Sequence, residues 1–127
     1  MMLLGKLAIG AVMIAITIVI HAFACDKVFN FIENHAKSFA ETFRGFWKIW
    51  SLIVSIFMIG AAIMIDIWLW TLLFYGLERD VFSRIEDALY FTTITFTTVG
   101  YGDIVLPPEW RLLSSSTAIN GMIIFGW

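Results

Sequence analysis

The run at positions 97–103, Thr-Thr-Val-Gly-Tyr-Gly-Asp, carries residue types suited to holding a dehydrated cation. Gly100 and Gly102 stand two positions apart, and glycine adopts backbone dihedrals that other residues avoid. This spacing lets successive carbonyl oxygens point the same way, and Thr98 adds a hydroxyl oxygen at one end. A row of such oxygens, repeated around an axis, replaces the water shell of a cation. The run therefore predicts a backbone segment that coordinates cations.

Non-helical backbone at membrane depth is tolerated only where it is buried in protein or lines a watery path. Around this run the sequence resembles the potassium-channel family, over residues 88–126. The resemblance implies a selectivity filter with K⁺ as the permeant ion and no organic cofactor. The filter carbonyls would come from Thr98 (which also supplies its hydroxyl), Val99, Gly100 and Tyr101, and the supporting residues would be Gly102, Asp103, Tyr90 and Phe91.

The resemblance also implies an architecture, an all-α membrane protein with the two-helix pore module of the bacterial type. Its pore domain would span residues 49–127, with an outer helix at 49–76, a pore helix at 84–97, the filter at 98–103 and an inner helix at 110–127. Relative to the family, that inner helix is incomplete. Four filter loops close one ring in the family, and this sequence contains one loop. The expected partners are therefore three identical subunits, which make a homotetramer.

Within the inner helix, Gly121 stands where the family places its hinge glycine, and Met122 and Phe125 would lie near the cavity below the filter. Close helix packing of the small-residue kind is an equally good interpretation of Gly121. The sequence departs from some simple bacterial members at Ile94, where they carry a glutamate that pairs with the aspartate after the filter. Filter gating that depends on that pair is not expected here.

The start of the pore helix is predicted to be capped by its own side chains. Ser83 followed three residues later by Glu86 is typical of a capping box. Glu86 and Asp87 also suit the positive end of the helix dipole. The opposite, carbonyl end would point toward the base of the filter, where its partial negative charge favours a dehydrating cation.

Composition places the chain in a lipid bilayer. Hydrophobic residues make up 61% of the 127 residues and charged residues 14%, a balance that a soluble domain of this size cannot bury. The net charge of −2 argues against a nucleic-acid partner. We find no nucleophile–base pair and no metal-ligand spacing, so neither an enzyme nor a small-molecule substrate is expected. Cys25 is the only cysteine, and no intrachain disulfide can form.

Two further segments are expected before the pore domain. Residues 1–25 form an apolar run that is just long enough to span, and residues 26–48 have the amphipathic pattern of a helix on the membrane surface. The first run also imitates a signal peptide, with a cleavage-like site at residues 22–24. Topology favours its retention, because an outward-opening filter requires residues 26–48 to be cytoplasmic. We expect a bacterial plasma membrane with an extracellular filter mouth.

One acid, Asp66, lies inside the expected outer helix. An acid in a membrane helix is costly against lipid, so Asp66 should face protein. It could act as a protonatable brace behind the filter, or it could be a neutral, hydrogen-bonded packing acid. The second interpretation is slightly favoured. Its candidate partners are Thr92, Thr93, Thr95, residues 114–117 and Asn120.

The expected function is passive, potassium-selective conduction across a membrane. A weakly selective cation channel is one alternative, because filter chemistry also depends on Tyr90 and Phe91, which stand where related channels often carry tryptophans. A non-conducting, channel-like subunit that regulates true channels is the other alternative. Only the incomplete inner helix favours it.

Overall fold

The computed structural model describes residues 3–42 and 45–126, and the side chains of residues 36–40 and 42 lie outside the described set. Residues 43, 44 and 127, which belong to segments expected from the sequence, also lie outside it. The described residues contain helices and no strands, which confirms the all-α class. The elements are α1 (Leu3–Thr42), α2 (Trp47–Leu77), α3 (Ile85–Phe96) and α4 (Arg111–Gly126).

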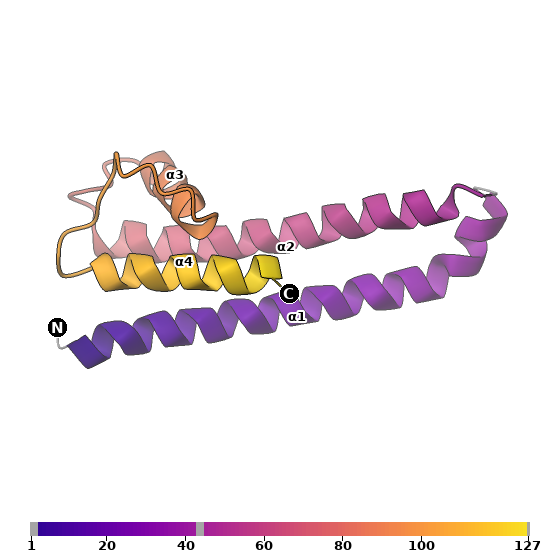
Figure 1. Cartoon of the computed structure of the whole chain (residues 1–127), viewed down its shortest axis with the longest axis horizontal. Coiled ribbons are helices and arrows are strands. Elements are labelled where there is room, and N and C mark those ends of the chain that lie inside the picture. Colours follow the sequence, from indigo (N-terminus) through magenta and orange to yellow (C-terminus); the bar gives the residue numbers. More distant parts are fainter. Residues whose placement is uncertain (1–2, 43–44, 127) are drawn as a thin grey trace.

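The long helices α1 and α2 form an antiparallel hairpin, and α4 lies along the first half of α1 (Figure 1). The short helix α3 packs against α2 and α4 at the end of the hairpin where the N-terminus lies (Figure 1). The loop that follows α3 is therefore at the same end of the molecule as the start of α1 and the start of α4.

Two helices of the described chain are long and apolar enough to cross a membrane. They are the span Leu3–His35 of α1 and the whole of α2, whose 18-residue windows reach mean hydropathies of 2.5 and 2.4. Few of their residues are buried inside the chain, so most of their apolar surface is available to lipid. By length and composition, both helices are suited to lie in a lipid bilayer. At 16 residues, α4 is shorter than the roughly 20 residues that a membrane crossing needs.

The first helix differs from the sequence prediction. We expected a spanning helix to end at residue 25 and a surface helix to follow at 26–48, whereas the structure has one uninterrupted helix of 40 residues. The physical reason is that neither glycine nor proline occurs between residues 11 and 44, so nothing in this stretch stops a helix. The turn comes at Gly45, whose φ of +83° only glycine adopts readily. At about 1.5 Å per residue, α1 is about 60 Å long, twice the hydrocarbon thickness.

The core lies where α3 meets α2, directly beneath the loop that follows α3. Phe91 of α3 stacks edge-on against Phe74 of α2, with ring centroids 5.3 Å apart, and contacts Phe82 at 5.4 Å. Phe74 and Phe82 are almost fully buried, as is Trp70 one turn earlier on α2. This aromatic cluster fixes α3 at an angle to α2 and so determines where the segment after α3 begins.

The predicted capping box at the start of α3 is wrong. The first helical residue is Ile85, so the N-cap is Arg84 rather than Ser83, and no side chain caps the helix. Arg84 instead pairs with the two acids of the first turn, at 3.4 Å from Glu86 and 3.2 Å from Asp87. The two acids still lie at the positive end of the helix dipole, as expected.

Candidate ion-coordinating segment

The segment at 98–103 leaves α3 in a tight reversal that the carbonyl end of the helix anchors. The backbone N–H of Thr98 donates to the Thr95 carbonyl at 3.0 Å, and the N–H of Gly100 reaches back to the Ile94 carbonyl at 2.9 Å. The hydroxyl of Thr97 donates to the Thr93 carbonyl at 2.7 Å. The free carbonyls at the end of α3 are thus partly used to hold the beginning of the segment.

The backbone φ angle alternates between positive and negative values along this segment. Thr98, Gly100 and Gly102 have φ of +61°, +54° and +77°, whereas Val99 and Tyr101 between them have negative φ. Alternation of this kind allows successive peptide groups to turn the same way, as a row of carbonyl oxygens around one ion requires. Both glycines therefore adopt the conformations for which their spacing suggested them.

Thr98 is the residue whose conformation the sequence analysis missed. A β-branched residue at positive φ is a rare outlier, and such strain costs about 1–3 kcal/mol and persists only where the surroundings impose it. The hydrogen bonds from the N–H groups of Thr98 and Gly100 to α3 impose it here. The signal was present in the spacing, because counting back by two from Gly102 and Gly100 leads to position 98.

The structure brings two of the expected supporting residues together. The Tyr90 hydroxyl on α3 donates to Asp103 Oδ2 at 2.8 Å, which ties the far end of the segment to the helix. This hydrogen bond raises the pKa of the Tyr90 phenol, so the phenol keeps the proton it donates. Phe91, also expected to support the segment, instead lies in the aromatic core with Phe74 and Phe82. It supports the segment indirectly, by fixing α3.

We expect Tyr90→Phe to shorten the time for which the segment keeps this shape, because the link from α3 to Asp103 is lost while the ring remains. Single-channel recording would show this as shorter openings and faster decline of current, with the reversal potential unchanged. Tyr75→Phe is the matched control, since the ring of Tyr75 stacks under Arg79 at 5.1 Å without using its hydroxyl. Equal open times in the two variants would contradict the assigned role.

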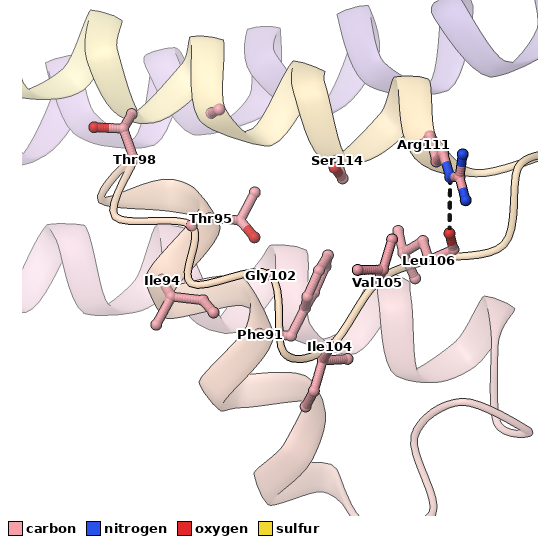
Figure 2. A pocket seen from close by; sticks show the side chains of 12 residues that line it. Phe91, Ile94, Thr95, Thr98, Gly102, Ile104, Val105, Leu106, Arg111 and Ser114 are labelled. Atoms are coloured by element: carbon pink, nitrogen blue, oxygen red, sulfur yellow. Dashed lines mark hydrogen bonds between the residues drawn. The ribbon is translucent and has the colours of Figure 1, made fainter.

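A cavity of about 300 Å³ separates the segment from α4 (Figure 2). Its walls come from α3, from the loop and from α4, and the Arg111 side chain closes one end by donating to the Leu106 carbonyl at 3.4 Å. The loop is thus held by α3 at its beginning and at Asp103, and by the Arg111 side chain of α4 at Leu106. The lining residues are Phe91, Ile94, Thr95, Thr98, Gly100, Gly102, Ile104, Val105, Leu106, Arg111, Ser114 and Ala118.

The apolar side chains of the segment lack a supporting shell within one chain. Val99 is 55% exposed and Tyr101 is 72% exposed. On α4, Met122 and Phe125 are also more than half exposed, although the Phe125 ring contacts Phe96 at 5.9 Å. Large exposed apolar side chains around a functional segment indicate a surface that other molecules cover.

Gly121 is the point of closest approach between α4 and α3. A Cβ atom at this position would collide with the carbonyl oxygen of Phe96, the last residue of α3, and would lie 2.7 Å from its carbonyl carbon. The close-packing interpretation of Gly121 is therefore correct. The hinge interpretation stays a prediction.

A family model described as "Ion channel" matches residues 60–127, more than half of the chain. The chain belongs to the ion channel family. The matched region contains most of α2 together with α3, the 98–103 segment and α4. Membership in this family also confirms that the chain is not an enzyme.

Three curated plant relatives match this ion channel over 40–53% of its length. Two-pore potassium channel 1 of Arabidopsis thaliana is 45% identical over 44% of this chain and 17% of its own length. Two pore potassium channel a of Oryza sativa subsp. japonica is 33% identical over 53% of this chain and 21% of its own length. Two-pore potassium channel 4 of Arabidopsis thaliana is 38% identical over 40% of this chain and 20% of its own length.

The matches confirm the expected potassium-channel resemblance at the level of family. The aligned part of this channel spans about a fifth of the length of these relatives. No solved structure matches it.

Asp66 of the channel faces α1, which the sequence analysis did not foresee. The acid is fully buried, and its Oδ2 lies 3.6 Å from Nδ1 of His21. Among the described residues, neither of its oxygens accepts a hydrogen bond from the expected partners. Asn120, one of those candidates, donates instead to Thr17 of α1 at 2.8 Å. The residues of α1 lie outside the family match, so family resemblance gave no signal for these contacts.

Proposed function

We propose that this chain is the subunit of a passive, potassium-selective channel in which four copies surround one axis. K⁺ would be held by the carbonyl oxygens of residues 98–101 and by the Thr98 hydroxyl. The observation that carries this proposal is the alternating φ of Thr98, Gly100 and Gly102. It is the backbone pattern that lets one extended segment present several carbonyl oxygens to one ion.

The need for further copies is supported by what one chain leaves uncovered. Val99 and Tyr101 are exposed, and apart from the adjoining residues no atom lies within 4 Å of the position a Cβ would take on Gly100 or Gly102. One chain can surround a cation on one side only. Four identical chains in a closed ring complete the coordination and also cover these side chains.

The arrangement of the helices supports an outward-opening filter with an external N-terminus. The N-terminus and the loop after α3 lie at the same end of the hairpin (Figure 1). The carbonyl end of α3 anchors the beginning of the segment, and partial negative charge at this end favours a cation there. In this orientation the turn at Gly45 is cytoplasmic. We retain the bacterial plasma membrane as the expected location, although the three relatives named above come from plants.

The proposal is tested by purifying the chain, measuring its native mass and reconstituting it alone in liposomes loaded with K⁺. We expect a particle of four 14.5 kDa chains and K⁺ efflux that stops when no counter-ion can move. A tetramer without flux would favour the non-conducting subunit. A particle that is not fourfold would contradict the proposed ring.

A weakly selective cation channel is the second candidate, and the exposure of Tyr90 favours it. The ring is 40% exposed and is held through a single hydrogen bond to Asp103. A filter braced this lightly could widen and admit Na⁺. Equal rates of K⁺ and Na⁺ flux from the same liposomes would support this candidate over the first.

A further inference from the structure

The first helix follows the inner helix closely, although α1 lies outside the family match. The contacts advance along both helices in the same direction, so α1 and α4 run parallel. Three contacts follow one another along the two helices: first a cation–π contact of 5.4 Å, then a close approach at a glycine, then a buried hydrogen bond. They join Lys6 with Trp110, Gly10 with Ser116, and Thr17 with Asn120.

The hydrogen bond between α1 and α4 is fully buried. Asn120 Nδ2 donates to Thr17 Oγ1 at 2.8 Å, and both side chains have no exposed surface. The Thr17 hydroxyl is itself fixed by the carbonyls of its own helix, at 3.0 Å from Met13. This buried polar contact favours one register of the two helices, because sliding them would leave the buried Asn120 amide without its acceptor, while Thr17 would keep the bonds within its own helix.

One turn further along α1, His21 makes the corresponding contact with α2. His21 and Asp66 are the only titratable side chains that are buried among the described residues. Their facing atoms lie 3.6 Å apart, and neither Asp66 oxygen has a hydrogen-bond partner there. Thr17 and His21 are four residues apart, so one face of α1 holds both α4 and α2.

These contacts lie next to the place where α4 touches the base of the ion-coordinating segment. Asn120 is followed by Gly121, whose backbone lies against the Phe96 carbonyl at the end of α3. Phe96 precedes Thr98, the first residue with positive φ, by two positions. A shift of α4 at Asn120 would therefore be transmitted directly to the residues that anchor the segment.

We propose that Thr17 and His21 are positioning residues, through which α1 holds α4 against α3 and keeps the filter in its conducting form. This inference rests on the proposed channel function. It assigns to the first helix a role in the balance between conducting and non-conducting states. The permeant ion and the assembly do not depend on it.

The first test compares three threonine variants by single-channel recording of the reconstituted full chain. Thr17→Val removes the acceptor for Asn120 at nearly constant volume, and Thr17→Ser retains it. Thr71→Val is the matched control, because Thr71 is equally buried but its hydroxyl bonds only within its own helix, to Ile67 at 2.8 Å. We expect Thr17→Val to lower the ratio of open to closed time about two- to tenfold, the effect of one hydrogen bond made in only one state. Thr17→Ser and Thr71→Val should leave the ratio near that of the parent chain.

The second test asks whether Thr17 acts through Asn120. A double-mutant cycle combines Thr17→Val with Asn120→Leu. The double variant should have an open-to-closed ratio no lower than that of the lower single variant, because each substitution removes the same hydrogen bond. His21→Leu should lower the same ratio independently, through Asp66. Strictly additive effects of Thr17→Val and Asn120→Leu would overturn the proposed connection.

The outcomes separate this inference from the channel proposal. An unchanged or raised open ratio in Thr17→Val overturns the role of α1, while an unaltered reversal potential leaves the channel proposal intact. A Thr17→Val chain that fails to assemble where Thr71→Val assembles also overturns it, because the bond would then serve folding alone. Loss of K⁺ flux from the parent chain would instead refute the channel proposal.

Discussion

Gly121→Ala prevents the pore domain from adopting its native packing, because the added methyl group has no space. A Cβ at this position would overlap the Phe96 carbonyl oxygen, which is backbone and cannot swing aside. Overpacking against movable side chains already costs about 1–3 kcal/mol, and a backbone obstacle must displace a whole helix. We expect Gly121→Ala to lose its discrete oligomer in size-exclusion chromatography and to unfold at a markedly lower temperature.

The control for this prediction is Gly60→Ala in the middle of α2. Gly60 is also helical, but no atom beyond its chain neighbours and its own helix backbone lies within 4 Å of the position its Cβ would take. Alanine favours the helix by up to about 1 kcal/mol over glycine, so this variant should be as stable as the parent or slightly more stable. If Gly121→Ala unfolded at the same temperature as Gly60→Ala, α4 would not pack against α3 as described.

We expect Gly100→Ala and Gly102→Ala to abolish the proposed selective flux, for a different reason. Neither site is crowded, but their φ values of +54° and +77° cost an alanine about 1–2 kcal/mol each. The segment relieves this strain by rotating its peptide groups, and the carbonyl oxygens then no longer face one ion. Each variant is expected to assemble normally and to show little preference for K⁺ over Na⁺ in bilayer recordings.

Gly45→Ala is the matched control for the filter glycines. Gly45 has a φ of +83° and open space around its Cβ position, but it lies in the turn between α1 and α2. The same backbone strain is therefore introduced far from the 98–103 segment. Gly45→Ala should retain the selectivity of the parent chain. Parent-like K⁺ selectivity in Gly100→Ala or Gly102→Ala would show that alternating φ is not what selects the ion.

The features that the sequence predicted well are those encoded locally. Glycines at positions 100 and 102 suggest positive φ at alternate residues, and both glycines have positive φ. Long apolar runs likewise have one physical consequence, and α1 and α2 are long enough to cross a membrane. The bounds of α2, α3 and α4 lie close to the outer, pore and inner helices that the sequence suggested.

Errors arose where competing local signals had to be weighed. The change from apolar to amphipathic pattern near residue 26 was interpreted as the end of a helix, although a change of pattern breaks no hydrogen bond. The helix continues to Thr42, three residues before Gly45. Ser83 and Glu86 matched a capping box by spacing, but α3 begins one residue too late for Ser83 to cap it.

The contacts that α1 makes with α4 and α2 were not accessible from the sequence at all. Thr17 and His21 are single polar residues in an apolar run, and nothing in their spacing says which helix they will meet. Their partners Asn120 and Asp66 are determined by how the hairpin folds back along α4. Asp66 was expected to pair with the pore or inner helix, because those helices were the only neighbours that the family resemblance supplied.

The central claim is that carbonyl oxygens of residues 98–101 replace the hydration shell of K⁺. The most direct measurement is the reversal potential of the purified, reconstituted chain in a planar bilayer, with K⁺ on one side and Na⁺ on the other. The account predicts a reversal potential displaced far toward the equilibrium potential of K⁺. A reversal potential near zero would contradict it.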